Sequence, residues 1–70
     1  MDNQERAKLK ALLKYWIEHN QEHGQEFREW ADKAGELGQT AQELLQAAQE
    51  MERAGEHLAR ALAHLEAGEG

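Results

Sequence analysis

The sequence predicts an all-α protein built as an antiparallel helical hairpin, and two observations carry this prediction. The chain of 70 residues has no proline, twelve alanines, nine leucines and twelve glutamates, and Ile17 and Thr40 are its only β-branched residues. Alanine, leucine and glutamate are among the strongest helix formers. Apolar residues also recur alternately three and four positions apart along two segments, with glycines between them. We therefore expect one domain, residues 1–70, containing two long helices.

The first helix is expected at about residues 4–36. Asp2 followed by Glu5 has the spacing of a capping box, which marks a helix start. The apolar stripe that follows keeps a seven-residue repeat, the pattern typical of left-handed bundle packing. Trp16, Phe27 and Trp30 are therefore expected in the core. The full stripe is Leu9, Leu13, Trp16, Asn20, His23, Phe27, Trp30, Ala34 and Leu37.

The second helix is expected at about residues 40–66. Gly35 and Gly38 favour the end of the first helix, and Thr40 followed by Glu43 again has capping-box spacing. Because the connection is short, the helices must be antiparallel neighbours, and folding about residues 37–39 brings His19 level with His57. The stripe of this helix is Ala41, Leu44, Ala48, Met51, Gly55, Leu58, Leu62 and Leu65, flanked by Ala47, Ala54 and Ala61.

The small size of the chain predicts self-association. A domain of this length buries only about 60% of the surface of its unfolded chain, and without cysteine no disulfide can add stability. Leu12, Ile17 and Leu45 widen the apolar stripes beyond one seam. A homodimeric four-helix bundle is the economical way to bury them. A monomeric hairpin that docks on a protein partner would bury the same surface.

Charge and hydropathy argue against nucleic acid and membrane as partners. The formal net charge is −6, and half of the eight basic residues lie in one short N-terminal segment, so a nucleic-acid binder is not expected. That basic segment is expected to lie beside the acidic end of the second helix, around Glu66 and Glu69. No apolar run approaches the length of a membrane span and no signal peptide is recognisable, so we expect a soluble, cytoplasmic protein.

Two histidines suggest a metal site in the first helix. His19 and His23 are four residues apart, so their imidazoles project from one helix face about one turn apart, the spacing that lets both reach one metal ion. Glu22 and Glu26 extend the cluster. Imidazole and carboxylate ligands suit zinc, copper(II), nickel, iron or manganese, whereas the absence of thiolate disfavours copper(I).

The second helix offers Glu50 and His57 as further ligands, because the hairpin brings them near the height of this cluster. A dimer doubles every ligand. The Glu-x-x-His signature of dinuclear carboxylate bundles is missing, so we favour a histidine-rich mononuclear or loosely dinuclear site. Gly24 and Gly55, both inside helices, suggest room for a ligand or simply close packing.

Two alternatives to a metal site remain open. Asn20 and His23 together form a polar layer in the stripe, and such a layer sets pairing and register in helical bundles without any ligand. Bundle histidines also serve as axial haem ligands, although no attachment motif supports haem here. An enzyme is not favoured, because the chain has no serine or cysteine nucleophile; metal-dependent redox or hydrolytic chemistry is the only plausible catalytic route. We assign no catalytic residue.

The segment LKYWIEHNQEHGQEFREWADKA, residues 13–34, resembles small, largely uncharacterised helical-hairpin proteins of anaerobic bacteria and archaea. Their pattern is W-I-E-H-N-x-E-H followed by an aromatic residue and W-A, and AAQEMERAGEHLARAL in the second helix is similar to the same family. The resemblance carries no established activity. It implies a helical hairpin and a motif that comprises Trp16, His19, Asn20, Glu22 and His23.

Overall fold

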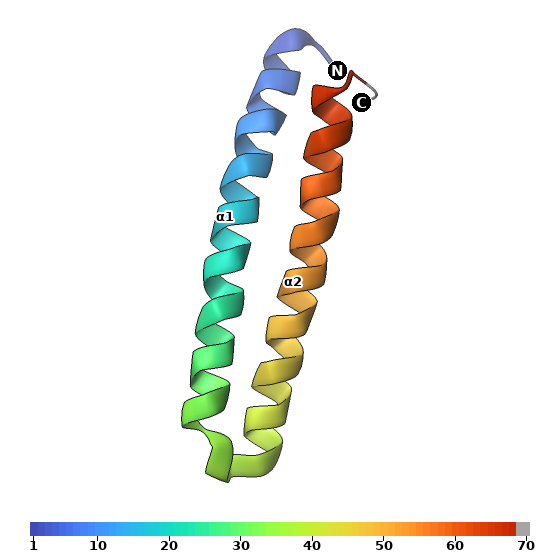
Figure 1. Cartoon of the computed structure of the whole chain (residues 1–70). Coiled ribbons are helices and arrows are strands. Elements are labelled where there is room, and N and C mark those ends of the chain that lie inside the picture. Colours follow the sequence, from blue (N-terminus) through green and yellow to red (C-terminus); the bar gives the residue numbers. More distant parts are fainter. Residues whose placement is uncertain (69–70) are drawn as a thin grey trace.

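The protein is a hairpin of two long helices (Figure 1). The computed structural model describes residues 1–68 and contains helix α1 (Asn3–Lys33), a single 3-10 turn η1 (Gly35–Leu37) and helix α2 (Gly38–Glu66). The hairpin measures 51 × 15 × 14 Å between Cα atoms. The predicted all-α class and the two packed, antiparallel helices are confirmed.

The start of α1 is confirmed, whereas its end lies three residues before the expected one. Asp2 accepts a hydrogen bond from the Glu5 amide at 2.8 Å, and Glu5 accepts one from the Asp2 amide at 3.3 Å. This capping box satisfies amide groups that no helical carbonyl can reach. At the other end, the Leu37 amide donates to Ala34, so the chain tightens into η1 instead of continuing the helix to residue 36.

The predicted capping box at Thr40 is wrong. Helix α2 begins at Gly38, and Leu37, the residue before it, makes no side-chain cap. Gly38 has a φ of 20°, a backbone conformation that favours glycine. The chain therefore turns directly from η1 into α2, and Thr40 is already inside the first turn of the helix.

The predicted stripe of α2 is confirmed, and that of α1 is confirmed in part, because Leu13, Asn20 and Ala34 are buried or half-buried whereas both tryptophans are exposed. All eight predicted α2 stripe residues are buried or half-buried. In α1, Ile17, Gly24 and Ala31 occupy the interface, whereas Trp16 and Trp30 are 40% and 58% exposed. The cause is volume: a Cβ atom at Gly24 would lie 3.4 Å from the Cβ of Met51, so tryptophan does not fit between helices this close.

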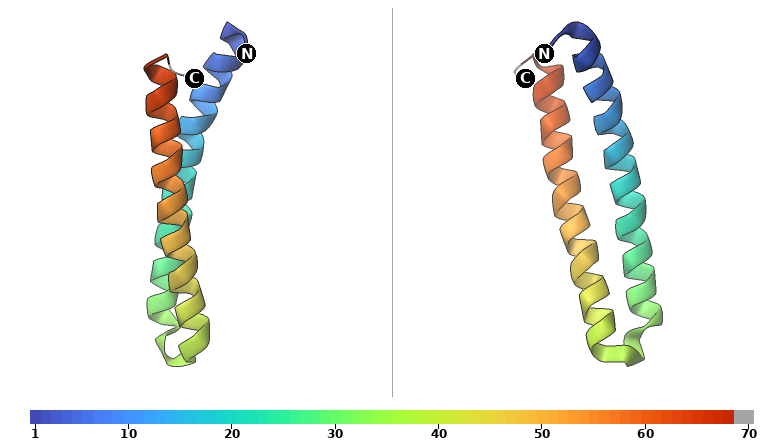
Figure 2. Two further views of the ribbon diagram at one scale, coloured as in Figure 1. Left: turned by 90° about the vertical axis from the view of Figure 1, so that its right-hand side faces the viewer. Right: turned by 180° about the vertical axis from the view of Figure 1, so that it is seen from behind.

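The register follows the predicted fold about residues 37–39. Gly24 lies beside Met51, Asn20 lies beside Gly55, and the Lys10 ammonium is 3.4 Å from the Glu66 carboxylate. The ion pair confirms that the basic start of α1 meets the acidic end of α2; Glu69 lies outside the described residues. Figure 2 shows the two helices side by side along their length, crossing at a shallow angle.

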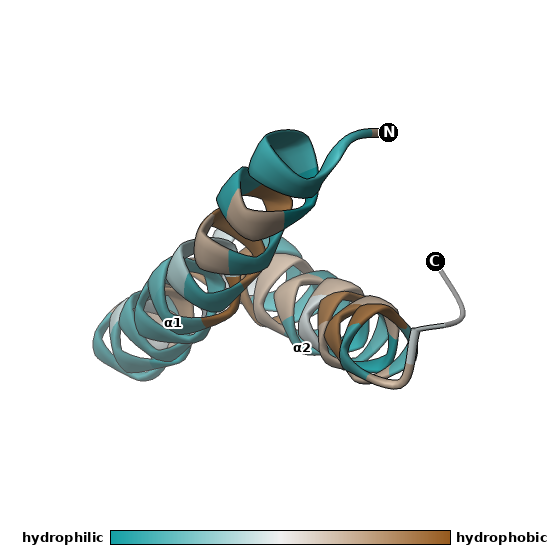
Figure 3. Ribbon diagram, turned by 90° about the horizontal axis from the view of Figure 1, so that it is seen from above, coloured by the Kyte–Doolittle hydropathy of each residue, from teal (hydrophilic) through white to brown (hydrophobic). Residues whose placement is uncertain are grey.

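The interior of the hairpin is small. Among residues 1–68, the buried hydrophobic side chains are Leu13, Ala31 and Ala48. In the view along the hairpin, the side of α1 that faces away from α2 is mostly hydrophilic, and hydrophobic residues of α1 lie on the side towards α2 (Figure 3). Neither helix in this part of the chain is long and apolar enough to cross a membrane. Two helices alone thus leave much of their apolar surface accessible.

Gly55 is expected to matter because it leaves space for Asn20, whose amide lies 3.5 Å from the Cβ position of that glycine. Gly55→Leu should displace the amide and lower the free energy of unfolding by about 1–3 kcal/mol. Gly55→Ala is the matched control: its methyl group fits at van der Waals distance, and the gain in helix propensity should make it neutral or stabilising by up to about 1 kcal/mol. Urea unfolding followed by circular dichroism at one fixed protein concentration measures both. Equal stability of the two variants would contradict the packing described for Gly55.

Candidate functional site

The two histidines of the predicted cluster face each other on α1. The Nε2 atoms of His19 and His23 are 3.0 Å apart, and the rings meet edge to face with their centroids 4.4 Å apart. His19 is exposed and His23 is half-buried. At this distance the two nitrogens form a hydrogen bond in which one imidazole donates to the other, at a place that solvent can reach.

This pair has the geometry of two neighbouring ligands of one ion. Nitrogens bound at about 2.0–2.1 Å to a single zinc ion lie roughly 3 Å apart when the angle at the metal is near 90°, and roughly 3.4 Å apart at the tetrahedral angle. A separation of 3.0 Å needs little adjustment for either. Two imidazoles alone leave other coordination positions open for further ligands.

Aromatic neighbours hold the two imidazoles from either side. Tyr15 stacks on His19 with ring centroids 5.2 Å apart, and Phe27 lies 6.1 Å from His23. The four rings form a column along α1 because each residue follows the previous one by four positions, about one helical turn. We did not expect this column from the sequence, although the spacing of Tyr15, His19, His23 and Phe27 carries the signal.

The other predicted ligands do not join the pair within one chain. No group of three or more histidine, aspartate or glutamate side chains suited to a metal ion occurs among residues 1–68. Glu22 and Glu26 are exposed on α1. On α2, Glu50 accepts a hydrogen bond from Gln46 at 3.2 Å, and His57 accepts one from Arg60 at 3.2 Å. Glu50 and His57 thus interact with residues of their own helix.

The two residues of the predicted polar layer, Asn20 and His23, make contacts with different parts of the hairpin. Asn20 is half-buried and its side-chain amide donates to the Met51 carbonyl across the hairpin. His23 instead faces His19 on its own helix. In the single chain, Asn20 therefore ties α1 to α2, and His23 is left as part of the histidine pair.

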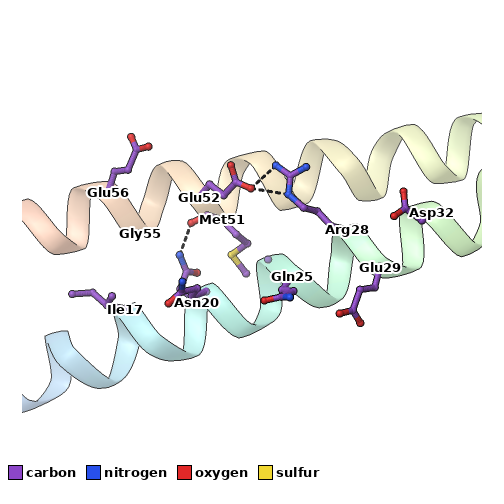
Figure 4. Close-up of a pocket in the computed structure, with 12 residues that line it drawn as sticks. Ile17, Asn20, Gln25, Arg28, Glu29, Asp32, Met51, Glu52, Gly55 and Glu56 are labelled. Carbon is purple, nitrogen blue, oxygen red and sulfur yellow. Dashed lines mark hydrogen bonds and ion pairs between the residues drawn. The ribbon is translucent and has the colours of Figure 1, made fainter.

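A groove of about 680 Å³, lined by both apolar and polar residues, runs along one side of the hairpin (Figure 4). Arg28 closes part of it by donating from its Nε to the Glu52 carboxylate at 2.8 Å, with a second, shorter bond from Nη2. The residues on this side each follow an interface residue by one position. They are Gln21, Gln25, Arg28 and Asp32 of α1 with Glu52 and Glu56 of α2.

The opposite side of the hairpin carries two rows of a different character. Residues that precede an interface position by one lie here, because one step back turns both antiparallel helices away from the groove. On α1 these include Trp16, His23 and Trp30, which we call the bulky row; Leu12, His19, Glu26 and Lys33 lie on the same side. On α2 they include Ala47, Ala54 and Ala61, which we call the alanine row; Glu43, Glu50 and His57 lie on the same side. The histidine pair thus lies at the border of an apolar face.

Comparison with known proteins places the chain in a family without assigning an activity. No curated protein and no solved structure matches it significantly. A family model described as Domain of unknown function (DUF8180) matches residues 9–65, which include the histidine pair, the Asn20–Met51 contact and both rows. The protein is therefore a member of the DUF8180 family.

Proposed function

We propose that the protein is a homodimeric four-helix bundle that binds a divalent transition-metal ion through His19 and His23. The convergence of the two Nε2 atoms at 3.0 Å is the observation that carries this proposal. Zinc, copper(II), nickel, iron and manganese all accept imidazole ligands, and the net charge of −6 attracts cations over anions. Metal storage, sensing or structural stabilisation are the roles that fit such a site.

The exposed apolar face supports the dimer. Trp16 and Trp30 are 40% and 58% exposed, on a chain with three buried hydrophobic residues in its described part. A face of 51 × 15 Å has the size of the roughly 800 Å² that each partner buries in a standard stable interface. A second copy of the hairpin offers an identical apolar face, so a bundle of four helices buries both.

A second candidate is a metal-free interaction module. The Asn20–Met51 hydrogen bond favours it, because this contact needs no ligand and resembles the polar layers that fix pairing in helical bundles. The two candidates share the apolar face and differ in the role of the histidine pair. Metal content and its effect on stability separate them.

Zinc binding should depend on the histidine pair. Added Zn²⁺ should raise the melting temperature, since an ion at 100 times its dissociation constant adds about 2.7 kcal/mol to the free energy of unfolding. Replacing His19 or His23 by alanine should abolish this shift, because the single imidazole that remains cannot chelate the ion. His64→Ala, which removes a histidine outside the proposed ligands, should keep it. Isothermal titration calorimetry and thermal melts with and without chelator measure both effects. A shift that survives the loss of the pair would refute the proposed ligands.

The dimer should depend on the bulky row. Sedimentation at micromolar concentration should give about twice the chain mass of 8.0 kDa. Trp16→Glu and Trp30→Glu should each yield monomers, because a buried unpaired carboxylate is costly. Gln21→Glu adds the same charge on the polar side and should leave the dimer intact. A wild-type monomer at high micromolar concentration would rule out the homodimer and favour docking on another protein.

A further inference from the structure

We infer that the two copies pack around a two-fold axis parallel to the helices, with α1 of each copy against α2 of the other, and that His57 of one copy completes the metal site of the other. This inference rests on the proposed function and adds to it the orientation of the partner and a third ligand. It predicts two identical sites for each dimer.

The two rows of the apolar face are complementary in size and spacing. Each row has a period of seven residues, and one consists of large side chains where the other consists of methyl groups. Large side chains packed against alanine let neighbouring helices approach to the usual 8–10 Å. When a bulky row packs against an alanine row, the large side chains therefore fill the space above the alanine methyl groups.

The rows also match in height. A two-fold axis parallel to the helices keeps every residue at its own height, so α1 meets the other α2 in the register seen within the hairpin. In that register Lys10 lies beside Glu66, and Asn20 lies beside Gly55. Within two residues, this brings the bulky row level with the alanine row of the second copy: Trp16 with Ala61, His23 with Ala54, and Trp30 with Ala47.

A two-fold axis perpendicular to the helices fits less well. It places the turns at opposite ends and packs α1 on α1 and α2 on α2, so bulky row meets bulky row and alanine row meets alanine row. One pair of helices is then forced apart while the other is left loosely packed. Charge is compatible with the parallel axis, which brings Lys33 level with Glu43 of the second copy.

The same arrangement gathers the remaining predicted ligands. His19 and Glu26 lie four residues before and three residues after His23, and Glu50 and His57 have the same spacing around Ala54. When His23 is level with Ala54 of an antiparallel neighbour, His19 comes within one residue of the height of the second copy's His57, and Glu26 comes within one residue of the height of its Glu50. His57 and Glu50 are exposed and interact only locally in the contacts described above.

The result is a site of three imidazoles next to two carboxylates. Three histidines with one carboxylate or water make a common zinc coordination sphere. The two facing glutamates repel each other unless a cation lies between or beside them. A divalent ion at the histidine pair relieves that repulsion, which links metal binding to the assembly of the two copies.

The orientation of the copies can be measured with spin labels, since the chain has no cysteine of its own. A label on Glu36→Cys in η1 should give a distance between copies of about 20 Å or less when the turns lie at the same end, because neighbouring helix axes are 8–10 Å apart. The perpendicular axis predicts a distance near the 51 Å length of the hairpin. A label on Gln21→Cys, near mid-height on the outer side, should give a distance well below 51 Å that is similar in either case, and thus controls for dimer formation. A long distance at residue 36 overturns the inferred orientation.

The contribution of His57 in trans can be tested by mixing variants. His57→Ala alone should weaken Zn²⁺ binding at least tenfold, since even indirect supporting residues of metal sites contribute that much. When it is mixed with a His19→Ala/His23→Ala double variant, each mixed dimer regains one intact site. Random mixing should then restore tight binding to roughly one ion for every four chains. If His57 acts within its own chain or not at all, mixing restores nothing and the inferred ligand is wrong.

These outcomes separate the inference from the proposed function. Tight zinc binding that needs His19 and His23 but is unaffected by His57→Ala keeps the proposed function and overturns the third ligand. A short distance at residue 36 with no zinc binding keeps the inferred orientation and overturns the metal site. A wild-type stoichiometry of half an ion per chain, instead of one, indicates that two histidine pairs share a single ion and contradicts the parallel arrangement.

Discussion

The close approach of α1 and α2 along a row of small residues determines most other features of this protein. Gly24 lies against Met51, and Gly55 lies against Asn20, at distances that leave space for little more than a methyl group. Side chains as large as tryptophan cannot enter such an interface without separating the helices. The hairpin therefore turns its bulkiest side chains away from its own partner helix, and a chain rich in apolar residues keeps a small interior.

This constraint also makes the two sides of the hairpin different. Polar residues that follow the interface positions line the groove, in which Arg28 and Glu52 connect the helices. Residues that precede them include both tryptophans and His23. The histidine pair consequently lies beside the face that we propose a second copy of the chain covers, so that metal binding and assembly involve neighbouring residues. Asn20 has a separate role, because its bond to the Met51 carbonyl holds the register of the hairpin independently of any metal.

The sequence predicts those parts of the fold that depend on local rules. The capping box at Asp2, the two helices, their antiparallel packing and the stripe of α2 all follow from spacing and propensity, and the structure confirms them. Periodicity alone cannot choose between adjacent rows of α1, because residues 16, 23 and 30 repeat with the same period as residues 17, 24 and 31. The choice depends on side-chain volume against α2, which requires both helices at once. Thr40 has capping spacing, but the turn places the helix start earlier, at Gly38.

In the candidate site too, contacts within one helix can be predicted from the sequence, whereas contacts between helices cannot. The His19–His23 pair depends only on the helical repeat, so a spacing of four residues is enough to predict that the imidazoles meet. Glu50 and His57 belong to the other helix, and their position relative to the pair depends on how two hairpins associate, which the single chain does not determine. If a metal ion is bound by residues of both copies, it stabilises the dimer in proportion to its concentration, because an ion that binds only the assembled state shifts the equilibrium towards it. For a hairpin with so few buried side chains, such linkage makes the folded state itself responsive to the metal.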